Sequence, residues 1–226
     1  MNTLPPLDRS AKIIELRELI ARHGPLVPVR RRARLPTGIE PLDRALDGGL
    51  WKGGLVEIVA PRRSSGSASL LRGLLQHTSG ENQWSALIDG ADSFDPQLAG
   101  AQILSRLLWI RCHIAAEAMQ SADLLLRDGN LPLLCLDLCQ NPPSQLRKIA
   151  STTWYRLQRM IEPTSVALLT LSPSPLIPCA DVRLELHNIL SLEDLDHQPS
   201  ATLSKAKLET RRQRQGEEEE LLRRSA

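Results

Sequence analysis

The sequence predicts an α/β fold: a mostly parallel central sheet with helices on both faces, an N-terminal helix and a flexible, charged C-terminal tail. Two observations lead to this prediction. From Leu55 to Leu186, apolar runs of strand length alternate with helical patterns, as in a parallel sheet covered by helices. After about Ser191, charged residues come in blocks and apolar residues are few, so this part cannot bury enough surface to fold alone. The predicted parts are an N-terminal helix with a basic linker at 1–36, a core domain at 37–190 and a tail at 191–226.

The first predicted element is a helix from about Ala11 to Arg22, with Asp8 or Ser10 as its cap and with Gly24 and Pro25 ending it. One broad side of this helix is apolar and consists of Ile13, Ile14, Leu16, Leu19 and Ile20. A helix this short is marginal on its own, so we expect the apolar side to dock on the core, on a second copy or on a partner.

The linker from Pro25 to Pro36 carries a basic group that consists of Arg30, Arg31, Arg32 and Arg34. These arginines are candidates for contacts with DNA or a partner, because they could neutralise backbone phosphates. A run of like charge that simply stays hydrated is the alternative.

The core begins with a helical pattern from Thr37 to Leu46, which Gly48 and Gly49 end. A buried strand from Leu55 to Ala60 and an amphipathic helix follow, the latter with Leu70, Leu71, Leu74 and Leu75 at helical spacing. The next predicted elements are a strand at Trp84–Ile88, a helix at Leu98–Leu104 and a short strand at Leu107–Ile110.

The second half of the core repeats this alternation. Its predicted elements are a helix at Ala115–Arg127 with Ala116, Met119, Leu124 and Leu126 among its apolar positions, a strand at Leu131–Leu138, a helix capped by Ser144 that runs through Met160, and strands at Val166–Leu171 and Val182–Leu186. Lys148, Arg156 and Arg159 share a basic side of the long helix. They are either a solvated flank or a contact surface for DNA or a partner.

The loop between the first core strand and its helix has the context of a phosphate-binding loop, because N–H groups at a helix N-terminus favour an anion. The full motif needs two glycines, a lysine and a hydroxyl in order. Here Ala60 replaces the first glycine, Gly66 stands for the second, Ser67 replaces the lysine and Ala68 replaces the hydroxyl residue. The degenerate loop consists of Ala60, Pro61, Arg62, Arg63, Ser64, Ser65, Gly66, Ser67, Ala68 and Ser69. We expect the shape of a nucleotide site without catalytic residues, without a metal site and without productive binding of ATP or magnesium.

Two further positions bear on hydrolysis. Asp137 ends the central strand, where a Walker B aspartate would hold magnesium through water, although a structural hydrogen-bonding role is the alternative. Ala91 stands where a water-activating glutamate is expected, and the neighbouring Asp92 is one residue too late to reach the same place. The sequence therefore favours a protein that is not an enzyme.

Composition narrows the function classes. The 226 residues are 42% apolar, enough for one substantial core, and 28 basic against 26 acidic residues leave a net charge of only +2. No global positive field therefore draws this protein to nucleic acid, and 3% aromatic residues argue against a base-stacking surface. The four cysteines fit buried thiols better than a metal site, and the absence of a signal peptide or long apolar run predicts a cytoplasmic location.

Four segments resemble bacterial RecA recombinases, in the same order along the chain. LPTGIEPLDRALDGGLWKGGLVEI (Leu35–Ile58) resembles the segment that leads into the RecA phosphate loop. ALIDGADSFDP (Ala86–Pro96) resembles the second strand and its turn, Leu107–Leu138 resembles the strand, helix and Walker B strand that follow, and CADVRLEL (Cys179–Leu186) resembles a late core strand. The resemblance implies a RecA-like fold for the core.

Within the RecA-like superfamily, the missing lysine, the N-terminal helix and the short core look most like the ImuA family, the accessory proteins of bacterial translesion DNA synthesis. This resemblance implies an SOS-induced adaptor that links a Y-family polymerase-like protein to an error-prone C-family DNA polymerase, with RecA and the sliding clamp as further partners. It also implies association with the nucleoid when active, weak DNA contact and no membrane, and it leaves self-association open.

Two other functions compete with the adaptor. One is a divergent DNA-repair ATPase that uses Asp137 and Asp92, with Arg62 or Arg63 in place of the lysine, since arginine binds phosphate well. The other is an inhibitor that resembles the SulA cell-division regulators, which are RecA-like and also lack the phosphate loop. The tail is either a solubilising end or a segment that orders on a partner.

Overall fold

The computed structural model describes Glu18 and residues 33–62, 65–187 and 207–213. The chain divides into two compact units, Met1–Arg32 and Ala33–Ala226. The helix predicted at Ala11–Arg22 lies outside the described residues except for Glu18, which is helical, and the linker arginines 30–32 also lie outside them.

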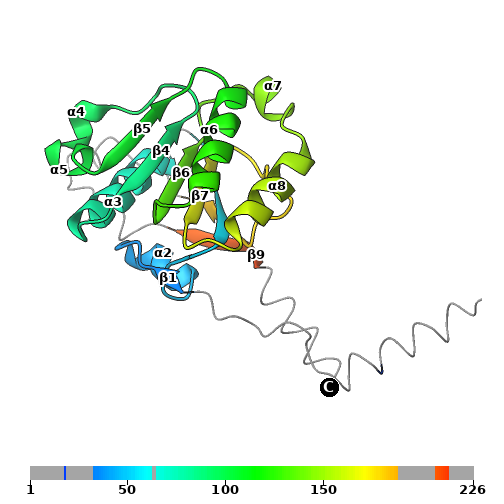
Figure 1. Ribbon diagram of the computed structural model, residues 1–226, viewed down its shortest axis with the longest axis horizontal. Coiled ribbons are helices and arrows are strands. Elements are labelled where there is room, and N and C mark those ends of the chain that lie inside the picture. Colours follow the sequence, from blue (N-terminus) through cyan, green and yellow to red (C-terminus); the bar gives the residue numbers. More distant parts are fainter. Residues whose placement is uncertain (1–17, 19–32, 63–64, 188–206, 214–226) are drawn as a thin grey trace, which may run out of the picture. The chain divides into compact units, whose positions relative to one another are not determined.

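A seven-stranded sheet forms the centre of the second unit (Figure 1). Its strands, in spatial order, are β5 (Leu107–Arg111), β4 (Ser85–Asp89), β6 (Leu133–Asp137), β7 (Ala167–Ser172), β3 (Gly54–Val59), β8 (Val182–Leu186) and β9 (Leu208–Gln213). The first six run parallel and only β9 is antiparallel. Every residue of β3, β4 and β7 is buried, as expected for strands covered on both faces. The predicted α/β class is therefore confirmed.

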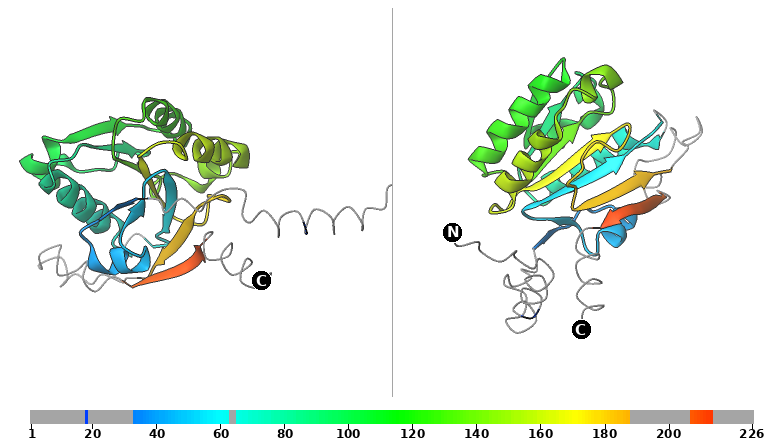
Figure 2. Two further views of the ribbon diagram at one scale, coloured as in Figure 1. Left: turned by 60° about the horizontal axis from the view of Figure 1, so that its bottom comes forward. Right: turned by 90° about the vertical axis from the view of Figure 1, so that its right-hand side faces the viewer.

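Helices cover both faces of the sheet, and Figure 2 shows α6 and α8 on one side of the strands and α2 on the other. The helices are α2 (Glu40–Ala45), α3 (Ser67–Gly80), α4 (Pro96–Ala99), α5 (Ala101–Leu104), α6 (Ala115–Asp128), α7 (Pro143–Leu146) and α8 (Ser151–Ile161). A short hairpin of β1 (Arg34–Leu35) and β2 (Leu50–Trp51) precedes β3. Adjacent residues of β3 point to opposite faces of the sheet and belong to two separate hydrophobic clusters. Val56 belongs to the cluster that includes α3, and Leu55 belongs to the cluster that includes α6 and α8.

The leucines of α3 behave as their spacing predicts, because Leu70, Leu71, Leu74 and Leu75 are all buried. The predicted helix at Ala115–Arg127 is confirmed as α6, but only two of the four apolar positions named for it, Met119 and Leu126, are buried. Ala116 and Leu124 are exposed, Leu124 by 69%, while the side that meets the sheet consists of Ala115, Ala118, Met119, Ala122 and Leu126. The small alanines let this helix lie close to the strands.

Two predicted helices are split in the structure. The segment predicted at Leu98–Leu104 becomes α4 and α5, which meet at Gly100 with its left-handed φ of 81°. The helix predicted from Ser144 to Met160 becomes α7 and α8, because Ala150 takes an extended conformation and interrupts the helical backbone. Ser144 lies inside α7 and is not its cap, since Pro142 occupies that position.

The tail predicted to lack fixed structure contributes a strand. β9 pairs with β8, its Leu208 packs against the core, and its Arg211 pairs with Glu185 of β8 at 2.9 Å. The expectation of disorder at 191–226 is therefore corrected for residues 208–213. Charge dominates the composition there, but cross-strand pairing with the edge of β8 supplies the hydrogen bonds that the isolated segment lacks.

A fully buried carboxylate joins the strands on the β8 side of the sheet. Glu57 of β3 accepts hydrogen bonds from the Arg183 guanidinium at 2.6 Å, from the Ser172 hydroxyl at 3.1 Å, and from the backbone N–H groups of Leu176 at 2.7 Å and Ile177 at 3.3 Å. Four donors from two strands and a loop thus satisfy one buried charge. This network fixes the chain after β7 against β3 and β8.

Candidate functional site

The candidate site lies where β3, β4 and β6 end. In parallel α/β sheets, ligands bind outside the carboxyl ends of the strands, and the strand–loop–helix unit of β3 and α3 opens at this edge. β7 lies between β3 and β6, so the loop after β3 and the carboxylate at the end of β6 approach across one strand.

The loop after β3 closes on itself. The Arg62 N–H donates to the Ser65 hydroxyl at 3.2 Å, and the Ser65 N–H donates to the Arg62 carbonyl at 3.0 Å. Ser65 is 1% exposed, whereas Pro61 and Arg62 are exposed. Gly66 begins α3 with a left-handed φ of 88°, a conformation that costs glycine little. Arg63 and Ser64 lie outside the described residues.

The residue at the lysine position makes a contact that the sequence did not predict. The Ser67 side chain lies near the Cys139 thiol, two residues beyond Asp137, and it opposes the rise that burial causes in the pKa of this thiol. The first turn of α3 therefore lies beside the end of β6, as the nucleotide-site shape requires. The polar group of Ser67 lies near a protein thiol, however. Ala68, the next residue, is exposed and has only a methyl group as its side chain.

Asp137 lies where the sequence predicted it, at the end of β6. Its Oδ1 accepts a hydrogen bond from the Cys139 N–H at 2.9 Å. Burial raises the pKa of Asp137 to about 6, the Cys139 hydrogen bond opposes this effect, and the Asp89 carboxylate adds to it. Within the described part of the chain, no cation is among the groups that shift this pKa. The site thus holds an acidic group whose charge the protein compensates poorly.

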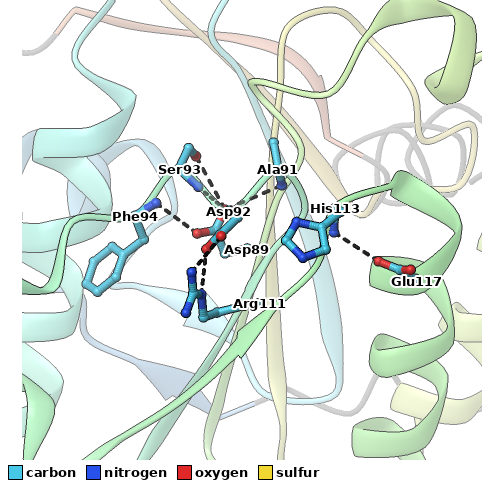
Figure 3. Close-up of polar contacts among 8 residues, drawn as sticks. All are labelled: Asp89, Ala91, Asp92, Ser93, Phe94, Arg111, His113 and Glu117. Carbon is cyan, nitrogen blue, oxygen red and sulfur yellow. Dashed lines mark hydrogen bonds and ion pairs between the residues drawn. The ribbon is translucent and has the colours of Figure 1, made fainter.

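Asp89, at the end of β4, is a residue that the sequence analysis did not assign to the site. Its Oδ1 accepts from the backbone N–H groups of Ser93 at 3.0 Å and Ala91 at 3.4 Å and from the Ser93 hydroxyl at 3.3 Å, and its Oδ2 accepts from the Phe94 N–H at 2.8 Å (Figure 3). This buried carboxylate therefore organises the whole turn after β4. An aspartate followed by Gly, Ala, Asp and Ser was the available signal, since such side chains commonly bond the backbone of their own turn.

Asp92 is held away from a general-base role. Its carboxylate forms a bidentate pair with Arg111 of β5, with both N–O distances at 2.7 Å (Figure 3), and this pairing lowers the pKa of Asp92. The Arg111 guanidinium also lies 5.1 Å from the centre of the Trp109 ring. Ala91, at the glutamate position, carries no proton acceptor in its side chain. At positions 91 and 92, the turn therefore presents no unpaired carboxylate that could act as a general base.

The structure separates the basic candidates. Arg34 belongs to β1, where its guanidinium lies 4.7 Å from the Trp51 ring centre and 3.8 Å from Asp47, so packing engages it. Lys148 and Arg156 come together, because both line a cavity of about 650 Å³ between α6 and the α7–α8 segment. Arg159 is exposed on α8 and is not part of that lining.

The described residues were also compared with the patterns of metal sites and of membrane-spanning helices. No group of three or more histidine, cysteine or acidic side chains there is arranged to hold a metal ion. All four cysteines are free thiols, and Cys112, Cys135 and Cys179 are buried. None of the helices described is both long enough and apolar enough to cross a membrane.

The structure is consistent with a RecA-like α/β fold. It has a mostly parallel sheet with helices on both faces, a loop and helix that follow β3, and an aspartate that ends β6. Comparison with known proteins supports this class. The chain is 33% identical over 106 residues to Protein RecA of Frankia alni and 34% identical over 106 residues to Protein RecA of Xylella fastidiosa, and it is 35% identical over 109 residues to Protein RecA of Clavibacter michiganensis.

Each of these matches covers 46% of this chain and spans only 30% of the RecA protein. No protein family model matches the chain. The similarity therefore supports a place in the RecA-like superfamily.

Proposed function

We propose that this chain is a RecA-like protein of DNA repair that works as a non-catalytic adaptor in SOS-induced, error-prone translesion DNA synthesis. The similarity to RecA proteins supports the DNA-repair context. The resemblance of the sequence to the ImuA family supports the narrower role. The adaptor links a Y-family polymerase-like protein to an error-prone C-family DNA polymerase in the bacterial cytoplasm, near the nucleoid, with RecA and the sliding clamp as further candidates.

The main support for a protein without catalytic activity comes from the side chains at the carboxyl ends of the strands. A serine, Ser67, lies near the Cys139 thiol where a lysine ammonium would meet the β- and γ-phosphates. Asp137 and Asp89 end adjacent strands in register, and Asp137 has a pKa of about 6. Without a lysine or a bound cation, the triphosphate of ATP would add negative charge beside these carboxylates, which disfavours binding.

The structure of the turn after β4 argues against the competing ATPase hypothesis. Its substitute base, Asp92, is paired with Arg111, and its pKa is lowered, so it is a weak proton acceptor held by another partner. Arg62 remains exposed and Arg63 lies outside the described residues, so a nucleotide titration is the direct test of both arginines.

That titration uses the full chain, magnesium and a fluorescent ATP analogue. The adaptor proposal expects no saturation up to millimolar nucleotide and no phosphate release. The matched variant is Arg62→Ala/Arg63→Ala. Micromolar binding that this variant abolishes would overturn the proposal in favour of a divergent ATPase.

The partner role needs a separate experiment, in which the immobilised full chain captures purified candidates. We expect retention of the Y-family polymerase-like protein or the C-family polymerase, with the same yield with and without ATP, because the adaptor needs no nucleotide state. The tubulin-like cell-division protein serves as the matched alternative. Its retention together with loss of both polymerases would favour a SulA-like inhibitor.

A further inference from the structure

The strand β5 forms one edge of the central sheet, and its outer side has no strand partner among the described residues (Figure 1). Just before β5 begins, the Arg106 carbonyl accepts from the Ser85 N–H at 3.0 Å. Just after β5 ends, the Cys112 N–H donates to the Asp89 carbonyl at 2.9 Å. The even-numbered residues of this stretch therefore face β4, and the odd-numbered ones direct their backbone N–H and C=O groups away from the sheet. The outward-facing residues are Leu107, Trp109 and Arg111.

Apolar side chains follow this edge. Leu107 and Trp109 are partly buried against one hydrophobic cluster and Ile110 against the other, while Leu108 remains 42% exposed. The opposite edge of the sheet differs, because Arg211 of β9 forms ion pairs with glutamates of β8 and β9. Charged residues protect a sheet edge from further pairing, whereas an apolar edge with free backbone groups favours it. The β5 edge is therefore suited to receive another strand.

The pattern of β5 matches a second copy of itself. Trp109 is the middle residue of the strand and faces outward. In an antiparallel pair, two residues that face each other in this way exchange both of their backbone hydrogen bonds. Two copies of β5 can therefore pair about a two-fold axis at Trp109, with Leu107 of each copy opposite Arg111 of the other. The strands then overlap over their full length, and the exposed Leu108 is covered by Ile110 of the second copy.

The same two-fold axis brings opposite charges together. By strand alternation, Arg106 lies on the side of the sheet that Ile110 and α6 share, and no ion pair within the described residues involves it. On that side, the Glu117 carboxylate of α6 lies beside the end of β5, where it accepts from the His113 N–H at 2.9 Å (Figure 3). In the two-fold pairing, Arg106 lies opposite Cys112 of the second copy, next to the Glu117 of that copy. Each copy thus offers one basic and one acidic group to the other.

We propose that β5 is a self-association surface, at which a second copy of this chain extends the sheet. The two copies pair antiparallel about Trp109, and Arg106 of each copy faces Glu117 of the other. The inference does not rest on the adaptor role, since it concerns only copies of this chain.

Analytical ultracentrifugation of the full chain tests the proposal. The wild type should form a dimer whose fraction rises with concentration over the micromolar range. Leu108→Lys places a charge on the paired edge and should weaken dimerisation by about tenfold, because the two-fold axis repeats the change in both copies. Tyr155→Lys is the matched control, since it introduces the same residue at a position of similar exposure on α8, which packs against β3 in the interior of the sheet. This control should leave the dimer unchanged.

A charge exchange tests the two-fold arrangement itself. Arg106→Glu alone and Glu117→Arg alone each turn both attractive contacts into repulsive ones, so each should weaken dimerisation by about tenfold. An equimolar mixture of the two variants has opposite charges at both contacts again, so it should associate as tightly as the wild type. Thermal melts check that each variant is folded. A wild type that stays monomeric up to millimolar concentration, a dimer that these variants leave unchanged, or a mixture that associates no better than its components would overturn the proposal.

Discussion

The turn after β4 and the loop after β3 lie at the same edge of the sheet but are built differently. In the turn, one buried carboxylate, Asp89, accepts four hydrogen bonds from residues 91–94. In the loop, one hydrogen-bonded pair between Arg62 and Ser65 closes the chain, and the exposed arginine is not tied to the core by it. The turn thus contributes to the stability of the sheet end, whereas the loop mostly connects β3 to α3.

A nucleotide-site shape without its chemistry, as the sequence predicts, would need such a difference between the two segments. The geometry of the edge depends on buried groups that are satisfied inside the protein, such as Asp89 and Glu57. The chemistry would depend on polar or charged side chains at the strand ends, and there Ser67 lies near the Cys139 thiol while Ala68 and Ala91 offer no polar side chain. Variants of the two kinds of residue should therefore behave in opposite ways.

The largest effect is expected at Glu57. Glu57→Ala leaves the Arg183 guanidinium and two backbone N–H groups without their acceptor, so the free energy of unfolding should fall by about 3–5 kcal/mol. Urea unfolding measures this loss. The matched control is Glu185→Gln, which weakens a more exposed pair on β8 and should cost less than about 1 kcal/mol. Equal effects of the two variants would contradict the role of the buried network.

A gain in stability is expected at Asp137. Its pKa in the folded state is raised from 3.8 to about 6, so folding favours the protonated form, and ionisation in the folded protein costs stability. The stabilisation by the protonated form is complete below the unfolded pKa and is lost as the pH rises through about 6. Asp137→Asn should therefore raise the free energy of unfolding at pH 7.5 by up to about 3 kcal/mol, and by roughly half as much at pH 5.

Paired urea titrations of the wild type and Asp137→Asn at several pH values check this expectation. The variant keeps an oxygen for the Cys139 N–H, so it removes the charge and retains this hydrogen bond. A loss of stability at pH 7.5 would show that the ionised carboxylate has a stabilising partner, and magnesium added to the wild type would then be the next titration.

A steric effect of intermediate size is expected at Gly90, in the turn after β4. A Cβ at this position would collide with the side-chain oxygen of Asn141 and would lie 2.7 Å from the Asp137 carbonyl oxygen. Gly90→Ala should therefore cost about 1–3 kcal/mol. Gly48→Ala is the comparison without a clash. A Cβ at Gly48 would have open space, so the cost there comes from the backbone, which has a φ of 106°. An unchanged melting temperature for Gly90→Ala would mean that the turn is softer than its hydrogen bonds suggest.

The smallest effect is expected in the loop. Arg62→Ala removes an exposed side chain and keeps the backbone N–H that bonds Ser65, so the free energy of unfolding should change by less than about 0.5 kcal/mol. The same urea titration measures it. A loss above about 1 kcal/mol would remove the contrast between loop and turn.

Much of the architecture could be predicted because it follows from local patterns. The apolar run of β3, the leucine spacing of α3 and the aspartate at the end of β6 are written in consecutive residues. The missing lysine and hydroxyl could be predicted in the same way, because the motif they belong to has fixed spacing.

The remaining features depend on residues far apart in the sequence. The Glu57–Arg183 pair joins positions on two strands that only the fold brings together, and the Ser67–Cys139 contact joins a helix start to a strand end. β9 was missed because its charged composition resembles that of a solvated tail, and only the free edge of β8 gives it a partner. The break between α7 and α8 depends on the extended backbone of Ala150, which has no clear sequence signal.

The antiparallel β9 has a practical consequence for choosing fragments of this protein. A fragment cut at residue 190, the boundary that composition suggests, would lose β9 and leave the backbone groups along β8 unpaired. Uncovered strand edges recruit strands from other molecules, so such a fragment should aggregate or give false positives in binding assays. Fragments meant for interaction mapping should therefore extend at least through Gln213.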